Sequence, residues 1–463
     1  MSNLEVIILA AGLGTRMKSA TVKVLHHAAG RPIIDYVVDL ANGLGSAQPI
    51  VIVGHQRERV QSALGDRARF AVQEQQLGTG HAVLQAEPHA AKSGRVLILS
   101  GDVPLTRPET LQRLIDEHER DQNALTLLTM KLDDPAMYGR IVRDDNNAVV
   151  RIVEAKDASA DEKRINEVNA GIYVFEADSL FDNLRNLSTN NAQGEYYLTD
   201  LLAVLRNSGK RVGAVVASDP IEALGVNSRS ELATVEAEIQ RRVVHQLMAN
   251  GVTFRNPATV VIDSTVTIGN DTVVYPFVTL EGTTSIGRDC VIEPGVHLIN
   301  VAVHDNVHIK TGTVAEDAII ESEAAVGPYA HLRPGTVLGK HVKVGNFVET
   351  KKAVFGEGAK ASHLSYIGDA EIGADVNIGA GTITCNYDGV NKHKTVLEDG
   401  VFIGSDSQLV APVRVGKGAY IGAGSTITKD VPADALALSR APQRVIEGWA
   451  TKKREERAAA KKK

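Results

Sequence analysis

Residues 262–297 read IDSTVT IGNDTV VYPFVT LEGTTS IGRDCV IEPGVH, and each block of six begins with an aliphatic residue. Gly often follows that residue, as after Ile268 and Ile286, and a small residue often lies four places after it. A helix has no period of six, and a half-buried strand alternates with a period of two. Short strands that wind into triangular coils do have this period, because each side points one large aliphatic side chain inward.

The period of six extends over most of the C-terminal 200 residues. Its phase is lost after Ile292 and returns between Ile320 and Val344. After a second break it returns at Ile372 and Ile378, and then runs from Leu397 to Ile427. The pattern resembles the hexapeptide-repeat family, whose left-handed parallel β-helix is an exception to the right-handed crossover rule. A β-sandwich with Gly-rich turns is the alternative, but so many positions in phase favour the β-helix. Aromatic residues make up only 4% of the chain, which suits a narrow interior without room for rings.

The N-terminal half has the pattern of an α/β domain. A buried strand is expected at residues 5–10, with further strands at 49–53 and 96–100 and helices at 33–43 and 110–119. This alternation predicts a Rossmann-like, doubly wound sheet with its site at the carboxyl ends of the strands. Ser228-x-x-Glu231 is a capping box, and an apolar stripe follows it up to Gly251, which predicts a linking helix. We therefore expect a nucleotidyltransferase domain at 1–229, a helical linker at 230–250, and a hexapeptide-repeat domain with a basic tail at 251–463.

Composition limits the partners and the compartment. The net charge of −6 provides no nucleic-acid footprint, and two cysteines, Cys290 and Cys385, cannot form a disulfide framework. No apolar run approaches membrane-spanning length, and the N-terminus lacks the pattern of a leader. We expect a cytoplasmic protein without membrane insertion.

The turn after the first strand contains Gly12-x-Gly14, which alone is a weak phosphate-loop signal because it lacks the rest of either nucleotide fingerprint. Arg16 and Lys23 follow closely, and both can meet phosphate oxygens. The string LAAGLGTRM at 9–17, with Lys23-Val24-Leu25 after it, resembles the sugar-nucleotidyltransferase signature. Further segments of that family follow in order: Gln73, LGTGHA at 77–82, SGDVPL at 100–105, YGRI at 138–141, IVE at 152–154, NAGIY at 169–173 and GVN at 225–227.

The chemistry of such a site is phosphoryl transfer between two anions. A sugar-1-phosphate oxygen attacks the α-phosphate of a nucleoside triphosphate in line, so Arg16, Lys23 and a Mg²⁺ ion are expected to neutralise the charge. Mg²⁺ prefers a few protein oxygens besides water and phosphate, and Asp102 and Asn227 suit that role. A lone Asp after a strand is more often a helix cap, but the Gly-Asp-Val-Pro turn after a buried strand favours a metal ligand.

Polar residues at the breaks in the repeat predict a second site, because loops on rigid scaffolds carry function. Arg333 stands where Gly is favoured, Lys351 and Lys352 end one run of coils, and His363 lies between two phases. The segment 384–394 is inserted between Ile378 and Leu397. Basic residues with a histidine suggest a phosphorylated substrate and a proton transfer, although a structural histidine is the commoner case. A metal at His304 and His308 is a third option, but no third ligand is evident.

From Leu4 to about Trp449 the chain resembles the bifunctional N-acetylglucosamine-1-phosphate uridyltransferase/glucosamine-1-phosphate N-acetyltransferase family. The resemblance implies a homotrimer with acetyl-transfer sites between neighbouring β-helices, and His363 as the general base. It implies sugar-phosphate contacts from Arg333, Lys351, Tyr366 and Asn377. It implies an acetyl-CoA path lined by Ala380, Asn386, Tyr387, Ser405, Ala423 and Arg440. For the nucleotide and its sugar it implies Leu9, Ala10, Ala11, Gly12, Lys23, Gln73, Gly78, Thr79, Ser100, Gly101, Asp102, Gly139, Glu154, Asn169 and Asn227. Ser100 stands where some relatives have an aromatic residue, which puts one substrate contact in question.

The predicted function is that of a bifunctional enzyme of UDP-N-acetylglucosamine synthesis, for peptidoglycan and lipopolysaccharide. It would acetylate glucosamine-1-phosphate and then transfer UMP from UTP to the product. The alternative is a nucleotidyltransferase whose β-helix only regulates or oligomerises; His363 and the Asn386-Tyr387 segment distinguish the two. A non-enzymatic repeat scaffold would leave Arg16, Lys23, Asp102 and Asn227 without a role.

Overall fold

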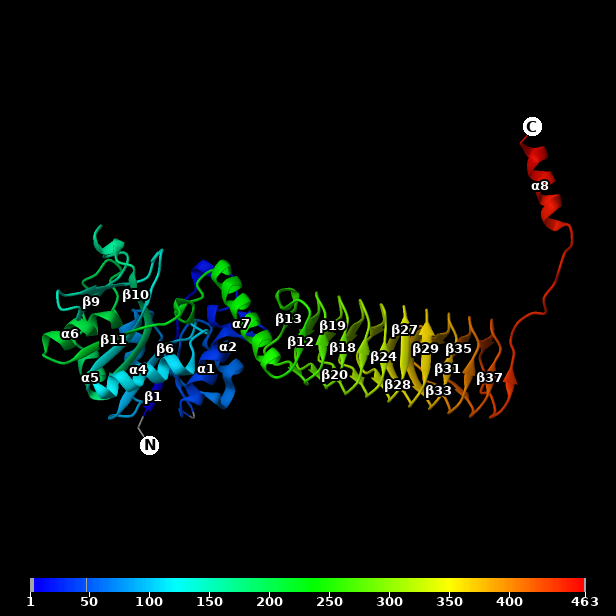
Figure 1. The fold of residues 1–463 in the computed structure, drawn as a ribbon, viewed down its shortest axis with the longest axis horizontal. Helices are drawn as coiled ribbons and strands as arrows, with labels where there is room; N and C mark the ends of the chain where they lie inside the picture. The colour runs from blue at the N-terminus through cyan, green and yellow to red at the C-terminus, as the bar shows by residue number, and fades with distance from the viewer. Residues whose placement is uncertain (1–3, 47, 462–463) are drawn as a thin grey trace. The chain divides into compact units, whose positions relative to one another are not determined.

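The computed structural model describes residues 4–46 and 48–461, and the chain divides into two compact units between Val243 and Val244 (Figure 1). The first unit is an α/β domain, and the second is built from coils of short parallel strands. Helix α7 (Arg229–Ala249) spans the division. The assignment of one activity to residues 1–229 and the other to 251–463 stays a prediction.

The N-terminal sheet is mixed rather than purely parallel. Its strand order is β11-β7-β10-β6-β1-β4-β5, and β1 pairs in parallel with β4 and β6, whereas β10 runs antiparallel to both β6 and β7. The strands are β1 Leu4–Ala10, β4 Ile50–Val53, β5 Arg69–Val72, β6 Arg95–Ser100, β7 Leu125–Lys131, β10 Glu167–Glu176 and β11 Val212–Val216, with a side hairpin of β8 Arg140–Arg143 and β9 Val149–Val153. The remaining two, β2 His27–Ala28 and β3 Arg31–Pro32, form a separate pair.

Helices cover both faces of this sheet. They are α1 Ile33–Gly43, α2 Arg57–Leu64, α3 Thr79–Leu84, α4 Pro108–Arg120, α5 Ala177–Leu184 and α6 Leu201–Asn207. Val6 and Ile8 of β1 belong to one core cluster with residues of α1, α2 and α4, while Ile7 belongs to another with residues of α3, α5 and α6. Because successive side chains of a strand point to opposite faces, the continuous apolar run of β1 fills both clusters. The turn that follows its carboxyl end lines the site.

Helix α7 begins at the predicted capping box. The Ser228 hydroxyl accepts a hydrogen bond from the Glu231 N–H (3.2 Å). Val235 and Ile239 are buried in a cluster with Met17 and Ile33 of the N-terminal unit. The first half of the helix therefore belongs to the core of that unit.

The second unit is a parallel β-helix with three sides, and its coils stack along one axis (Figure 1). The first side contains β12 Thr253–Phe254, β15 Val273–Val274, β18 Val291–Ile292, β21 His308–Ile309, β24 Ala325–Val326, β27 Lys343–Asn346, β29 Lys360–His363, β31 Asn377–Ile378, β34 Phe402–Ile403, β37 Tyr420–Ile421 and β39 Leu436–Ala437. The second contains β13 Val261–Ile262, β16 Thr279–Glu281, β19 His297–Ile299, β22 Val314–Glu316, β25 His331–Leu332, β32 Ile383–Cys385, β35 Gln408–Val410 and β38 Thr426–Ile427. The third contains β14 Thr267–Ile268, β17 Ser285–Ile286, β20 Ala302–Val303, β23 Ile319–Ile320, β26 Val337–Leu338, β33 Thr395–Leu397 and β36 Val413–Val415, while β28 Glu349–Phe355 and β30 Tyr366–Ile372 run through the second and third sides. A last helix, α8 (Trp449–Ala460), is exposed and basic.

The prediction that the coils are interrupted where the phase is lost is wrong. Between Ile292 and Ile320 the buried residues Leu298, Val303, Ile309 and Ala315 continue the inward column. The period slips because two sides are one residue shorter, so that Leu298 is followed by Val303 and Ala315 by Ile320.

At the second break, after Val344, one side is again one residue shorter, so that Thr350 is followed by Phe355, and in addition the inward residues are not Ile, Val or Leu. Thr350, Phe355 and Ala361 take the inward positions there, and all three are buried. The expectation that no ring fits the interior is also wrong, since Phe355 is 1% exposed. Within the part of the β-helix that the structure describes, from β12 to β39, the segment 386–394 between β32 and β33 leaves the coil as an insertion.

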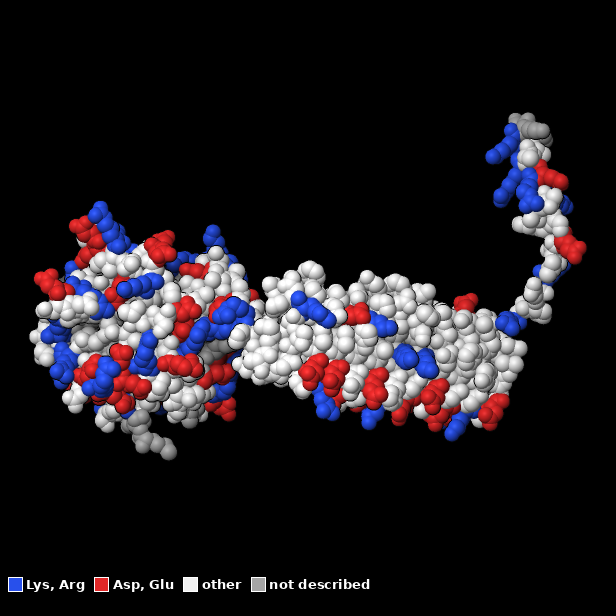
Figure 2. Space-filling model, viewed as in Figure 1, with Lys and Arg blue, Asp and Glu red and all other residues white. Residues whose placement is uncertain are grey.

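Charge is distributed unevenly over the β-helix. Figure 2 shows Asp and Glu side chains along one edge and few charges on the face of the coils turned to the viewer. Among residues 4–46 and 48–461, no helix has both the length and the apolar character needed to cross a membrane.

Candidate active sites

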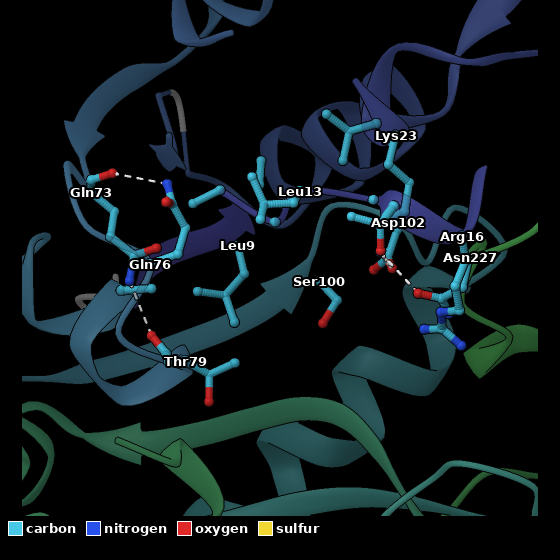
Figure 3. A pocket seen from close by; sticks show the side chains of 18 of the residues that line it. Leu9, Leu13, Arg16, Lys23, Gln73, Gln76, Thr79, Ser100, Asp102 and Asn227 are labelled. Atoms are coloured by element: carbon cyan, nitrogen blue, oxygen red, sulfur yellow. Dashed lines mark hydrogen bonds and ion pairs between the residues drawn. The ribbon is translucent and has the colours of Figure 1, made fainter. Parts of the chain in front are cut away.

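A pocket of about 470 Å³ lies at the carboxyl ends of β1 and β6 (Figure 3). The structure brings most of the predicted nucleotide-binding residues together in its lining: Leu9, Ala10, Ala11, Gly12, Arg16, Lys23, Gln73, Gly78, Thr79, Ser100, Asp102 and Asn227. These residues come from β1 and the segment that follows it, the segment before α3 and its first residue, the end of β6 and the turn after it, and the segment before α7. Their convergence follows from the parallel pairing of β1 and β6, which puts both carboxyl ends at one edge.

The turn after β1 packs closely against the segment that carries Lys23. Gly14 has a φ of 61°, and a Cβ added there would lie 2.8 Å from the Lys23 Cβ. Glycine is therefore required both by the left-handed backbone and by the close approach. This contact keeps the short helices Thr15–Met17 and Lys23–Leu25 together at the pocket, and with them the two cationic side chains of Arg16 and Lys23.

Asp102 and Asn227 converge on one positive charge. The Lys23 ammonium forms an ion pair with the Asp102 carboxylate and donates a hydrogen bond to the Asn227 Oδ1 (3.1 Å). Lys23 and Asp102 are each 16% exposed at the side chain, so the charges are partly shielded from water. The Val226 N–H also donates to the Asp102 carbonyl (2.9 Å), which holds the two segments side by side. One carboxylate and one amide oxygen around a single cation are a donor set that fits Mg²⁺.

Four predicted residues, Gly101, Gly139, Glu154 and Asn169, lie outside the lining of this pocket. A Cβ added at Gly139 would lie 3.4 Å from Glu154 Oε1, which accepts a hydrogen bond from the Thr199 hydroxyl (3.1 Å). Burial raises the pKa of Glu154, and the neighbouring carboxylates of Asp157, Asp200 and Glu195 raise it further. A buried carboxyl of this kind is suited to hydrogen-bond sugar hydroxyls.

Asn169 and Ser100 are tied to the middle of β10. The Asn169 amide donates to the Tyr173 hydroxyl (2.6 Å), and the Ser100 hydroxyl donates to the Gly171 carbonyl (3.2 Å). Ser100 therefore bridges β6 and β10.

Sequence reasoning missed two polar residues of the pocket, Gln76 and Glu195. Gln76 lies between two predicted motifs, Gln73 and the segment 77–82. Glu195 precedes Tyr196, whose carbonyl accepts a hydrogen bond from the N–H of Gly80, a residue distant in the sequence (2.8 Å). No motif marks Glu195, because only tertiary packing brings its loop to the pocket.

On the β-helix, four of the six residues predicted for acetyl-CoA form one row along a single corner. The N–H of Leu364 donates to the Asn346 carbonyl (3.0 Å), that of Gly381 to the Leu364 carbonyl (2.9 Å), and that of Asp406 to the Ala380 carbonyl (2.7 Å). The row continues as the Gly424 N–H donates to the Ser405 carbonyl (2.8 Å) and the Arg440 guanidinium to the Ala423 carbonyl (2.5 Å). His363, Ala380, Ser405, Ala423 and Arg440 thus follow one another on successive coils.

The side after this corner carries the cationic residues. Arg333 donates to Glu349 Oε1 (2.7 Å), and in the next coil Glu349 pairs with Tyr366 and Lys351 with Gly368. The ammonium of Lys392, which sequence reasoning missed, lowers the pKa of Lys351, and the charge of Arg333 adds to this effect. Three cations gathered on an open surface have the chemistry to bind a phosphate group.

Two further predicted residues, Tyr366 and Asn386, lie close together on this side, whereas Asn377 does not lie there. A Cβ added at Gly368 would lie 2.5 Å from the Tyr366 hydroxyl and 2.9 Å from the Asn386 amide nitrogen. Asn386 also donates to Asp369 Oδ2 (2.5 Å). Asn377 lies on β31, on the other side of the corner, where it pairs with Lys360 and Phe402.

His363 is exposed, and its imidazole Nδ1 lies 3.1 Å from the Asn346 Oδ1. Because an amide oxygen only accepts, Nδ1 carries the proton in this pair, and Nε2 presents its lone pair outward. Asn346 was missed by sequence reasoning, since its position beside His363 depends on the register of β27 and β29. His304 and His308, considered as metal ligands, instead face Glu321 (3.7 Å) and Glu293 (2.6 Å), and within the described ranges no three such ligands gather.

The insertion at 386–394 is an ordered loop. Tyr387 and Lys392 form an antiparallel bridge, and the Asp388 carboxylate accepts from the Asn391 N–H (2.7 Å) and faces His393 (2.8 Å). These bonds lower the pKa of Asp388 to about 2, the Asn391 N–H having the largest effect. Tyr387 is 60% exposed at the start of the loop.

Comparisons with known proteins agree with this two-part architecture. Residues 5–220 match the family model described as nucleotidyl transferase, residues 257–355 that of the GMPPB C-terminal domain, and residues 394–429 that of the bacterial transferase hexapeptide repeats. The bifunctional protein GlmU of Pelobacter propionicus is 53% identical, over 97% of this chain and 98% of its own. The bifunctional protein GlmU of Syntrophotalea carbinolica is 55% identical, over 96% of this chain and 96% of its own. That of Geobacter sulfurreducens is 50% identical, over 98% of this chain and 100% of its own.

Both halves of the relatives are thus present here, which favours the bifunctional interpretation over a single-activity enzyme with a passive β-helix. The chain is an enzyme that belongs to the bifunctional GlmU family, in which a nucleotidyltransferase domain is joined to a hexapeptide-repeat transferase domain.

Proposed function

We propose that this protein makes UDP-N-acetylglucosamine in two steps, one at each site. In the first, the amine of glucosamine-1-phosphate attacks the thioester carbonyl of acetyl-CoA, an amide bond forms and the CoA thiol leaves. In the second, a phosphate oxygen of N-acetylglucosamine-1-phosphate attacks the α-phosphate of UTP and pyrophosphate leaves. The observation that carries the proposal is that one chain holds both the Lys23–Asp102–Asn227 cluster and the row that begins at His363.

In the uridylyl-transfer site, Asp102 and Asn227 would hold Mg²⁺. The ion would supply positive charge to the reacting phosphates. Lys23 and Arg16 bind the phosphate oxygens from the other side, and Lys23 leaves its carboxylate partner when it does so. Gln73, Gly78 and Thr79 bound the part of the pocket that receives the uracil ring, and Glu154 and Asn169 orient the sugar.

In the acetyl-transfer site, proton transfer is the contribution of His363. Near neutral pH the amino group of a hexosamine is largely an ammonium ion, which has no lone pair for attack. Nε2 accepts the proton as the nitrogen attacks, while Asn346 keeps the imidazole in the required tautomer. Arg333, Lys351 and Lys392 bind the sugar phosphate, and Tyr366 and Asn377 contact the sugar. The corner row from Ala380 to Arg440, with Asn386 and Tyr387, receives acetyl-CoA.

The acetyl-transfer site is open in a single chain, and we propose that assembly into a homotrimer completes it. Phe277, Tyr329 and Phe347 lie at the same corner as His363 and are 69%, 55% and 57% exposed. All three have positive φ, and the rings of Tyr329 and Phe347 stack with centroids 5.9 Å apart. Exposed aromatic side chains on such strained backbone are unfavourable unless a second surface covers them. A neighbouring β-helix packed on this corner would enclose His363 as well.

The proposed substrates, UTP and acetyl-CoA, suit a cytoplasmic enzyme, and the two cysteines are free thiols. The product is a sugar nucleotide of the kind from which peptidoglycan and lipopolysaccharide are built.

Separate assays of the two half-reactions test the proposal. The pure protein should release CoA thiol from acetyl-CoA with glucosamine-1-phosphate, and pyrophosphate from UTP with N-acetylglucosamine-1-phosphate and Mg²⁺. Glucosamine and N-acetylglucosamine without phosphate are the matched control substrates. Release of pyrophosphate without any thiol release would contradict the proposal, because the β-helix would then have only a structural role.

A further inference from the structure

Helix α7 supports the uridylyl-transfer site through its first turn. In an ordinary capping box the acidic residue at the third helical position reaches back to the N–H of the N-cap residue. Here the N-cap is Ser228, but Glu231 Oε2 accepts instead from the N–H of Asn227, at 2.8 Å. The Ser228 hydroxyl donates to the same oxygen at 2.9 Å. The carboxylate is thus shifted by one residue onto the backbone of a residue in the pocket.

The bond matters because little else orients Asn227. Its amide oxygen accepts from Lys23 (3.1 Å), and its amide nitrogen donates only a long bond to the Gly225 carbonyl (3.3 Å). The segment before it is held on the opposite side, where the Val226 N–H donates to Asp102 (2.9 Å) and the Gly225 N–H to the Tyr138 hydroxyl (3.3 Å). Glu231 supplies the remaining anchor, on the helix side.

We propose that Glu231 is a positioning residue for uridylyl transfer, which holds the Asn227 backbone so that the Asn227 amide oxygen stays aimed at the cation site beside Asp102. The inference rests on the proposed function of that site. Its consequence is that the start of the linker helix, outside the pocket lining, belongs to the machinery that binds the metal.

Two variants of one helix separate positioning from simple helix capping. Glu231→Ala removes the anchor of Asn227. Glu236→Ala is the matched control. Glu236 lies on the same helix as Glu231, and its Oε2 also accepts a hydrogen bond from a backbone N–H, that of Ala29, at 2.8 Å. Glu231→Gln keeps an acceptor oxygen at the position and should restore most of the function. All are made in the full chain.

The primary readout is Mn²⁺ binding, followed by electron paramagnetic resonance in the presence of UDP-N-acetylglucosamine without turnover. We expect Glu231→Ala to raise the Mn²⁺ Kd about tenfold and the half-saturating Mg²⁺ concentration for pyrophosphate release by a similar factor. Glu236→Ala should leave both constants within twofold of the wild type, even if its Tm falls, and thiol release should be unchanged in all variants.

An unchanged Mn²⁺ Kd in Glu231→Ala, or an equal rise in Glu236→Ala, would overturn the role of Glu231. Failure of the Gln variant to recover affinity would also count against it. A wild-type protein without uridylyl transfer would instead overturn the proposed function, so the two failures are distinguishable.

Discussion

Lys23 meets Asp102 and Asn227 from positions 79 and 204 residues away in the chain. The motifs marked each of these residues singly, and the order of the motifs indicated one site. That a lysine would lie between two expected metal ligands was not predictable, because the contact depends on how three loops meet at the sheet edge. Asn346, Lys392, Gln76 and Glu195 were missed for the same reason: no local pattern distinguishes them from ordinary surface residues.

Asp102→Ala should abolish uridylyl transfer and spare acetyl transfer. The change removes a charged metal ligand and leaves Lys23 without its carboxylate partner, so a loss of at least about 10²-fold in pyrophosphate release is expected. Thiol release, measured on the same preparation, serves as the control. Parallel loss of both activities in a folded variant would argue for one composite site.

His363→Ala should lower the kcat of acetyl transfer by about 10²–10⁴-fold, the usual contribution of a positioned general base. The KM for glucosamine-1-phosphate should change less, because Arg333 and Lys351 bind the phosphate. His304→Ala is the matched control, because His304 is also a half-exposed histidine of the β-helix, paired with Glu321. Thiol release at the wild-type rate from the His363 variant would reduce His363 to a structural residue.

At the scale of elements, the period of six predicted the β-helix and most of its inward residues, but its gaps were misinterpreted. A side of five residues shifts the phase without opening the coil, and Thr350, Phe355 and Ala361 are buried although none of them is Ile, Val or Leu. The antiparallel β10 was likewise not predictable, because a strand buried on both faces has the same apolar pattern in either direction. Helix α7 was predictable, since its cap and its stripe are local signals.

The N-terminal unit should carry uridylyl transfer by itself, and helix α7 should decide how stable it is. A fragment of residues 1–229 contains every residue named for direct contact with phosphate and metal. It lacks Glu231, which holds the Asn227 backbone, and it lacks Val235 and Ile239, which fill the cluster with Met17 and Ile33. Burial of two such side chains is worth roughly 3 kcal/mol or more. Fragment 1–250 should therefore be active with a higher free energy of unfolding than fragment 1–229, as measured by urea denaturation. A folded 1–250 fragment that is inactive with UTP and N-acetylglucosamine-1-phosphate would contradict this division.

At the scale of the whole molecule, the two units are expected to work independently, while only one of them needs a neighbouring chain. Phe347→Glu puts a charge at the exposed aromatic corner, where it should not disturb the core of a single chain. We expect the variant to sediment as a monomer and to lose acetyl transfer by at least about 10²-fold, with uridylyl transfer unchanged. A trimeric Phe347→Glu variant with full acetyl transfer would show that this corner is not the interface.

The central claim is that one chain acetylates glucosamine-1-phosphate and then converts the product into the sugar nucleotide. The most direct measurement follows CoA thiol and pyrophosphate together when the pure wild-type protein is given glucosamine-1-phosphate, acetyl-CoA, UTP and Mg²⁺. The account predicts that thiol appears first, that pyrophosphate follows after a lag and approaches one equivalent per thiol, and that omitting acetyl-CoA abolishes both. Pyrophosphate released from glucosamine-1-phosphate without acetyl-CoA, or thiol released with no pyrophosphate after it, would contradict the account.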